Sequence, residues 1–237
     1  MPTGPFINTL LNHMGSDVIT RLQLRRVELP LKFELEVPGE GIHSVFFVEE
    51  GIGSMTTCFG NGAQVETSMF GYESAVGVSA LMGTKHSLNR IFMQLAGYGY
   101  ASPVRAAQTE FQRGEIFQKL ALRYVQAQLT LSTQNAACNA SHTYEQRLAR
   151  WLLICADRAK KDHLEMAQEF VSEMLGSTRS TVSIAAAHLK TKGLIDYHRG
   201  SIQLLKKKEL EVEACECYRV VRNHLETFAH FDTGFAV

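Results

Sequence analysis

The stretch MAQEFVSEMLGSTRSTVSIAAAHLKTKGLI, residues 166–195, limits the possible folds of this chain more than any other segment. Its pattern predicts a helix, a tight turn and a second helix. Two helices that cross steeply need a small residue in the first helix, a glycine with positive φ at the turn, and apolar residues on the inner face of the second helix. Ser172, Gly176 and Val182 occupy those places. The stretch therefore predicts a helix-turn-helix.

A β-hairpin is predicted directly after the second helix. An apolar strand follows Gly193, Arg199 and Gly200 provide the turn, and a second strand with alternating polarity runs over residues 201–205. A hairpin in this place is typical of the wing that accompanies many DNA-binding helix-turn-helix motifs. The two motifs together predict a winged helix-turn-helix.

The start of the second helix carries the side chains that we expect to face DNA. A recognition helix enters the major groove with its N-terminus first, so that its first-turn side chains reach base edges. Arg179 is expected to read guanine, because a guanidinium fork matches the O6 and N7 acceptors, and a phosphate contact or a salt bridge is its alternative role. Thr178 is expected to cap the helix or bind phosphate. The predicted DNA-binding residues are Thr178, Arg179, Ser180, Ser183 and, at the wing tip over phosphate or the minor groove, Arg199.

Positive charge is concentrated in the same part of the chain. The formal net charge of the whole chain is zero, yet residues 177–208 contain seven basic side chains against Asp196 alone. Such an imbalance favours a surface that faces a polyanion, and a merely solvated face is the alternative.

In the helix before the turn, Ala167 stands where a Ser or Thr N-cap is usual, which should cost that helix about 1 kcal/mol.

The first hundred residues have a different character. Thirteen of the 18 glycines lie within residues 1–103, between short β-rich runs such as 45–48, 54–58 and 91–95. Breakers at roughly the spacing of 8 to 12 residues that is typical of sandwiches and barrels predict an all-β N-terminal domain.

A long helix is predicted from Gly114 onward. Two apolar stripes run along it and give it more apolar surface than one β-domain would normally cover. Either both stripes pack within the chain, or the helix pairs with the same helix of a second copy. We favour the second copy, and hence a homodimer. The segment 135–141 is small and polar and is predicted as a hinge before the next helix, Tyr144–Ala159. The first stripe consists of Phe117, Leu120, Tyr124, Ala127, Leu131 and Gln134, and the second of Leu122, Val125 and Leu129.

The order of these elements resembles the Crp/Fnr superfamily of bacterial transcription regulators, the relatives of the cyclic-AMP receptor protein. The resemblance implies an α+β fold: a double-stranded β-roll of the cyclic-nucleotide-binding-like type, a dimerisation helix at about 114–136, and a winged helix-turn-helix. The implied domains are 1–141 and 142–237, the second with a helical extension beyond the wing. The motifs that carry the resemblance are EQRLARWLL (Glu145–Leu153), MLGSTRSTV (Met174–Val182) and GLIDYHRG (Gly193–Gly200).

The resemblance also implies a function. We expect a sequence-specific, homodimeric DNA-binding regulator, controlled by an effector through the β-roll. Its expected partners are double-stranded DNA, a second copy of the chain and RNA polymerase. Two alternatives remain at this point: a small-molecule or cyclic-nucleotide sensor whose C-terminal module contacts a protein, and an oligomerising β-barrel scaffold with an inert helical tail.

The effector is unknown from the sequence, and a cyclic nucleotide is not expected. Members that bind cyclic nucleotides carry a Gly-Glu pair followed by Arg next to Ser or Thr. In this chain Val78 stands where the Glu belongs, and Ile91 follows Arg90. Ser132 and Thr133 do fall where the family's purine-contacting residues would lie.

Metal binding, catalysis and membrane insertion are not expected either. No Cys precedes Cys58, where the iron–sulfur members of the family carry a cluster, and Cys215-x-Cys217 lacks the C-x-x-C spacing typical of a zinc site. No nucleophile elbow, phosphate-binding loop or paired catalytic carboxylates were found. Five scattered cysteines and the lack of a signal or membrane segment predict a cytoplasmic protein that is not an enzyme.

Overall fold

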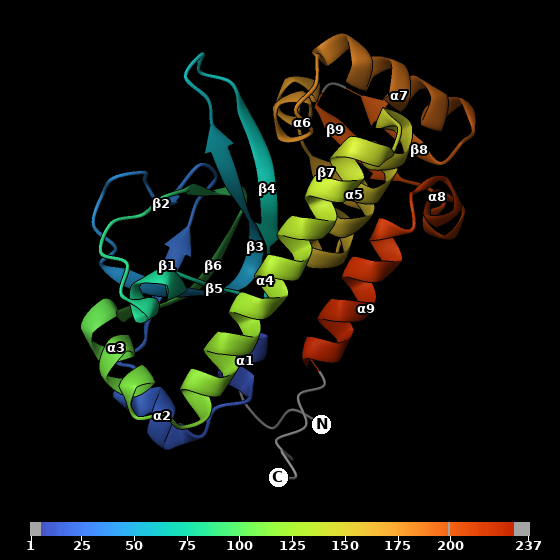
Figure 1. The fold of residues 1–237 in the computed structure, drawn as a ribbon. Coiled ribbons are helices and arrows are strands. Elements are labelled where there is room, and N and C mark those ends of the chain that lie inside the picture. Colours follow the sequence, from blue (N-terminus) through green and yellow to red (C-terminus); the bar gives the residue numbers. More distant parts are fainter. Residues whose placement is uncertain (1–5, 199, 230–237) are drawn as a thin grey trace. The chain divides into compact units, whose positions relative to one another are not determined.

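The computed structural model describes residues 6–198 and 200–229, with side chains described as far as Asn223 (Figure 1). Arg199, the residue predicted at the wing tip, lies outside these residues. The elements in chain order are α1 (Thr9–Asn12), α2 (Ser16–Arg21), β1 (Arg25–Leu29), β2 (Glu34–Glu36), β3 (Ser44–Cys58), β4 (Gln64–Phe70), β5 (Ala75–Val76), the 3-10 helix η1 (Val78–Met82), β6 (Arg90–Pro103), α3 (Val104–Gln112), α4 (Ile116–Ser141), α5 (Tyr144–Ala159), β7 (His163–Glu165), α6 (Gln168–Met174), α7 (Arg179–Thr191), β8 (Ile195–His198), β9 (Ser201–Leu204), α8 (Lys207–Glu213) and α9 (Cys217–Ala229).

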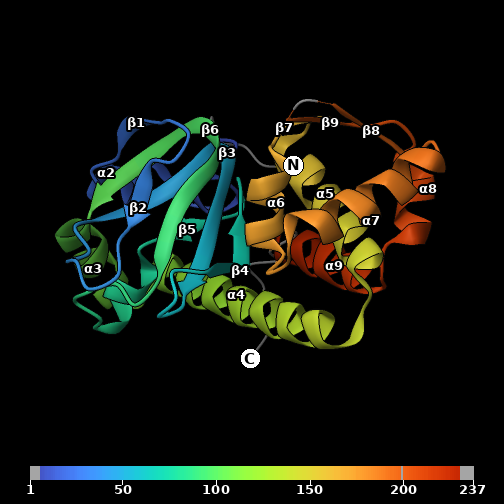
Figure 2. The ribbon, with the colours of Figure 1, turned by 90° about the horizontal axis from the view of Figure 1, so that it is seen from above.

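The described residues form two compact units. The first contains residues 6–53 and 70–130, and the second contains 54–69 together with 131–198 and 200–222. The α+β class predicted from the sequence is confirmed, with the strands of the large sheet preceding the helical C-terminal part (Figure 2). Among the helices of residues 6–198 and 200–229, none combines the length and the apolar character that crossing a bilayer requires.

The large sheet is built around two long strands. Its strands follow the order β1-β6-β3-β4, with β2 also paired to β6 and β5 to β3. Where pairs are defined residue by residue they are antiparallel, as in β1 and β6, where Arg25 lies opposite Ala101 and Leu29 opposite Gly97. The core beneath the sheet includes Phe47 of β3 and Phe117 of α4, whose ring centroids are 6.4 Å apart.

Several glycines that were predicted as strand breakers lie inside strands. The separate runs expected at 45–48 and 54–58 form the single strand β3, so this part of the prediction is wrong. Gly97 and Gly99 lie within β6, where an added Cβ would collide with the backbone carbonyls of Glu50 and Phe47. These glycines permit close approach of two backbones rather than a turn.

Helix α4 buries one of its two predicted stripes. Phe117, Leu120 and Tyr124 have almost no exposed surface, whereas 48% of Leu122 and 65% of Leu129 is exposed. The helix also extends further than expected. It runs to Ser141, so the hinge predicted at 135–141 is wrong, and the chain breaks only at His142 and Thr143 before α5. The segment contains three alanines, and alanine has the highest helix propensity of all residues.

Helix α5 matches its predicted bounds, and its start explains why. Thr143 accepts a hydrogen bond from the backbone N–H of Gln146, and the Gln146 side chain accepts one in return from the Thr143 N–H. This capping box fixes the first turn of α5. Helix α6 differs, because its N-cap is Ala167 and no side-chain hydrogen bond caps its N-terminus.

We predict that Ala167→Ser stabilises the protein. Ala167 is exposed and has extended backbone, so a serine hydroxyl can accept from the unsatisfied N–H groups of α6 without a packing change. The expected gain in the free energy of unfolding is about 1 kcal/mol, measured by urea denaturation. Ala167→Val is the control, because valine is as poor an N-cap as alanine; an equal gain in both variants would contradict the capping explanation.

Candidate nucleic-acid interface

Helices α6 and α7 are joined by the tight turn that the sequence predicts. Gly176 has φ of 58°, and its N–H donates to the carbonyl of Glu173 at 3.0 Å. The next N–H, of Ser177, donates to the carbonyl of Ser172 at 2.9 Å. These bonds end α6 with a left-handed glycine, a conformation in which an L side chain is strained. The turn therefore fixes the direction of α7 relative to α6.

One face of α7 is buried and the opposite face is exposed. Val182, Ala185 and Leu189 form the buried face, and α7 packs against α5 and α6. From α5, the guanidinium of Arg147 donates to the carbonyl of Leu175 at 2.5 Å and so holds the last residue before the turn. The packing leaves the N-terminal end of α7 facing solvent.

The first turn of α7 presents hydroxyl groups and one guanidinium. Thr178 is the N-cap, and its Oγ1 accepts from the N–H of Thr181 at 3.2 Å. Thr178, Arg179 and Ser180 are exposed. Among the side chains that the structure describes, no carboxylate forms an ion pair with Arg179. A duplex approaching this turn would meet a guanidinium that no acid neutralises.

Two further side chains complete this surface. Ser183 is half-buried, and its hydroxyl donates to the Gln168 amide oxygen at 2.8 Å, which ties it to the start of α6. Ile184 is 60% exposed and was not singled out in the sequence. The signal for it was present, because Ile184 falls outside the apolar positions that Val182, Ala185 and Leu189 occupy on the helix. An exposed isoleucine there can contact a thymine methyl group.

The predicted wing is a hairpin in a three-stranded sheet. Strands β8 and β9 pair antiparallel, with Ile195 opposite Leu204, and β7 adds a third strand that pairs with β9. The Tyr197 hydroxyl donates to the carbonyl of Met166, so the hairpin is bonded to the residues just before α6. Gly200 takes φ of 83° in the turn, as its position after Arg199 predicts.

The basic stretch 177–208 is less available for a polyanion than its composition suggests. Lys190 pairs with Asp196 at 2.6 Å, and Lys207 pairs with Asp157 at 2.9 Å. Lys192 contacts both Glu145 and Glu213, at 3.0 and 2.5 Å. Half-exposed pairs of this kind contribute little stability, but they reduce the local positive charge. Pairing with acids therefore removes part of the positive charge that the composition of this stretch suggests.

Comparisons with known proteins agree with this geometry. Residues 146–212 match the model of the Crp-like helix-turn-helix domain. The global nitrogen regulator of Nostoc sp. is 23% identical over 180 residues, which cover 71% of this chain and 80% of that protein. A Crp/Fnr-family regulator from Eubacterium rectale has a similar structure, with a TM-score of 0.69 at 14% identity, covering 89% of this chain and 97% of that one. FixK2 from Bradyrhizobium japonicum also has a TM-score of 0.69, at 15% identity, with 81% and 98% covered.

Residues 146–212 are thus a Crp-like helix-turn-helix domain, and the chain shares its fold with solved Crp/Fnr regulators. The matched domain contains the whole of α6, the turn, α7 and the wing hairpin. The family resemblance inferred from the sequence is thereby confirmed.

In the β-rich N-terminal part of the chain, Arg90 is held by a carboxylate. Its guanidinium pairs with Glu34 at 2.6 Å and lies 4.5 Å from the centre of the Phe92 ring. In the family's cyclic-nucleotide binders the arginine of the cassette holds a phosphate. Here it would have to leave Glu34 to do so.

A cluster of four metal-ligating side chains was missed in the sequence. Cys138, His142, Cys215 and Cys217 bring their ligand atoms within 4.8 Å of one another. Taken alone, Cys215 and Cys217 have a spacing that predicts no metal site. The overlooked signal was Cys138-x-x-x-His142, because residues four apart on a helix share a face.

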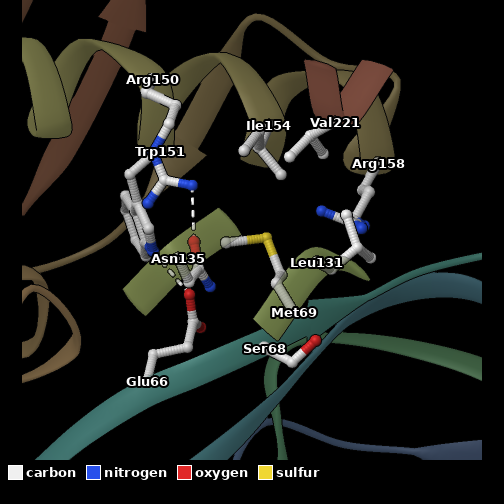
Figure 3. A pocket seen from close by; sticks show the side chains of 10 residues that line it. All are labelled: Glu66, Ser68, Met69, Leu131, Asn135, Arg150, Trp151, Ile154, Arg158 and Val221. Carbon is white, nitrogen blue, oxygen red and sulfur yellow. Dashed lines mark hydrogen bonds between the residues drawn. The ribbon is translucent and has the colours of Figure 1, made fainter. Parts of the chain in front are cut away.

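A buried carboxylate, Glu66 of β4, lies beside α5 in the second unit (Figure 3). It accepts from the Trp151 indole N–H at 2.9 Å and from the Ser54 hydroxyl at 2.5 Å, next to a cavity of about 20 Å³ that has room for about one water. Burial raises the pKa of Glu66 to about 7, against the opposing effect of these bonds and of Arg158 and Arg150. The carboxylate therefore titrates near neutral pH.

We predict that Glu66 makes the stability of the protein depend on pH. The ordinary pKa of 4.5 applies to the unfolded chain and about 7 to the folded one, so the folded state retains a proton that the unfolded state releases. The free energy of unfolding should fall as pH rises from 4.5 to 7, by up to about 3 kcal/mol. Urea denaturation from pH 5 to 8 should show this loss, and Glu66→Gln should remove it. Exposed Glu209→Gln is the control, and a loss of stability that persists in Glu66→Gln would contradict the assignment.

Proposed function

We propose that this regulator binds specific DNA sequences as a homodimer, with the first turn of α7 in the major groove. The observation that carries the proposal is the exposed N-terminus of α7, where Arg179 has no carboxylate partner among the described side chains. A guanidinium in that place can bond to the O6 and N7 acceptors of guanine. The function is one of binding, in the cytoplasm, and it requires no catalysis.

The other candidate contacts divide into two kinds. Thr178 and Ser180 lie at the helix start, where N–H groups and hydroxyls favour phosphate, and we assign them to positioning. Ser183 and Ile184 lie further along α7 and are candidates for base contacts. Arg199, predicted at the wing tip, would contact phosphate or the minor groove and add affinity that does not depend on sequence.

The homodimer is proposed to form through α4. Leu122 and Leu129 are exposed on this helix, seven residues apart, with Val125 half-buried between them. A seven-residue repeat of apolar side chains is typical of a helix that pairs with its copy. A two-fold dimer would present two α7 helices to two half-sites of a palindromic operator, about one helical turn apart. RNA polymerase, implied by the family resemblance, is the proposed further partner of the DNA-bound dimer.

The effector is proposed to differ from a cyclic nucleotide. The support is local: Val78 replaces the carboxylate of the cassette, and Glu34 holds Arg90. A phosphate at Arg90 would have to displace an ion pair that is only one-third exposed.

We predict that Arg179→Ala loses sequence discrimination. The bound sequence is first selected from a random DNA pool, and the dissociation constants for selected and scrambled duplexes are then measured at fixed salt. The ratio between them should fall by about 5- to 150-fold, the value of a lost bidentate contact of about 1–3 kcal/mol. Arg179→Lys keeps the charge and should lose discrimination as well, because a lysine cannot form the fork.

Arg105→Ala is the matched control, since Arg105 is also an exposed arginine but belongs to α3 of the first unit. It should bind both duplexes like the wild type. Unchanged discrimination in both Arg179 variants would leave Arg179 as a phosphate contact and overturn base readout.

We predict that Leu129→Asp converts the protein from a dimer to a monomer. An aspartate there would be desolvated against the partner helix without a compensating charge. Light scattering after size-exclusion chromatography should give half the wild-type mass. Leu88→Asp is the control, because Leu88 is 83% exposed but lies outside α4. A dimeric Leu129→Asp protein would place the dimer contact elsewhere.

A further inference from the structure

Four metal-ligating side chains from two distant segments of the second unit meet at one point. Cys138 lies in the last turn of α4, and the N–H of His142 donates to the Cys138 carbonyl at 3.0 Å, so both side chains lie on the same side of the chain. Cys215 lies between α8 and α9, and Cys217 begins α9. The fold thus joins residues separated by more than seventy positions.

The distances among these side chains fit one small ion. The sulfurs of Cys138 and Cys215 are 3.5 Å apart, and the sulfur of Cys217 lies 3.7 Å from Nδ1 of His142. A tetrahedral zinc with bonds of about 2.0–2.3 Å places its ligand atoms about 3.3–3.8 Å apart. All four ligand atoms lie within 4.8 Å of one another, so they need move little to surround an ion.

The surroundings also suit a metal-bound histidine and thiolates. His142 turns Nδ1 toward the cysteines, and its Nε2 lies 3.3 Å from a carboxylate oxygen of Glu216. A carboxylate on the second nitrogen orients a ligating histidine in many zinc sites. The Gln134 amide donates to the sulfur of Cys217 at 3.0 Å, and the positive charge of Arg150 acts on Cys138. Three thiolates and one imidazole around Zn²⁺ carry a net charge of −1, which a nearby arginine stabilises.

We propose that Cys138, His142, Cys215 and Cys217 bind a single zinc ion in a closed, structural site. Three cysteines and one histidine are an established ligand set of structural zinc, and four protein ligands leave no position for a substrate. The cysteines are almost fully buried and His142 is partly exposed, which leaves a route for the ion to enter. A single ion is favoured over an iron–sulfur cluster, because a cluster would hold its ligands further apart than these four atoms lie.

The ion would link the end of α4 to the junction of α8 and α9. Because these segments are far apart in sequence, such a link should stabilise the folded second unit and make its stability depend on metal. The assignment is independent of DNA recognition, since none of the four ligands lies on α7 or the wing.

Metal content and spectroscopy of the full-length protein test the site. Protein purified without chelator should contain about one zinc per chain by inductively coupled plasma mass spectrometry, and a strong chelator should lower its melting temperature. After metal removal, one equivalent of Co²⁺ should give the intense visible absorption of a tetrahedral ion and the charge-transfer band of thiolate ligands. Cys138→Ser and His142→Gln should each weaken zinc affinity at least 100-fold in competition with a fluorescent chelator.

Matched variants separate the site from other thiols. Cys58→Ser and Cys155→Ser change cysteines outside the cluster and should retain one zinc with wild-type affinity. Glu216→Gln, which affects the histidine but contributes no ligand, should weaken affinity 10- to 100-fold. If Cys138→Ser does not fold, the Co²⁺ spectrum of the wild type and the His142→Gln affinity decide the question.

Three results would overturn the proposal. The first is wild-type protein without zinc that also fails to bind Co²⁺ or Zn²⁺ tetrahedrally under reducing conditions. The second is a stable Cys138–Cys215 disulfide, seen as a mass two units lower before reduction, in protein that takes up no metal after reduction. The third is iron and acid-labile sulfide in anaerobically purified protein, lost in Cys138→Ser, which would assign a cluster instead.

Discussion

The burial of one face of α7 against α5 and α6 is the constraint on which the function of this chain depends. Val182, Ala185 and Leu189 can be buried only if α7 leaves the turn in one direction, and Gly176 in a left-handed conformation sets that direction. The same rotation of the helix leaves Thr178, Arg179 and Ser180 in solvent. Packing energy therefore decides which side chains can meet DNA, and Thr178 also caps the helix that it begins.

The parts of the structure that could be predicted are those with local causes. A capping pair such as Thr143 and Gln146, or a glycine at a tight turn, acts over a few residues and is readable in sequence. The bounds of α5, the helix-turn-helix and the β-hairpin were therefore predicted correctly. The pairing of long strands was not, because Gly97 has the same local signature whether it begins a turn or lets another backbone pass close to it.

Contacts between segments far apart in the sequence explain the other features that the sequence did not predict. The acids that pair with Lys192 come from α5 and α8, and no charge count along one segment could include them. Glu66 lies on β4 and is covered by Trp151 of α5, and burial raises its pKa even though the Trp151 hydrogen bond opposes that shift. The cluster of cysteines and histidine also depends on contacts between distant segments. Cys138 with His142, or Cys215 with Cys217, offers too few ligands for a metal site, and only the approach of α9 to the end of α4 brings all four together.

Helix α4 carries both the proposed dimer contact and one part of the proposed zinc site. Its middle exposes Leu122 and Leu129, where we propose the partner helix, and its last turn carries Cys138, where we propose zinc. A dimer can recognise a palindrome only if the spacing of its two α7 helices is fixed, which requires each α4 to be held firmly to the unit that contains α7.

Hydrogen bonds already hold the C-terminal end of α4, from Asn135 to the carbonyl of Thr67 and from Arg150 to Asn135. An ion bound by Cys138 and Cys217 would add a link from α4 to α9, whose Tyr218 bonds to Asp157 of α5. The position of α7 relative to the proposed dimer axis would then depend on contacts at the end of α4.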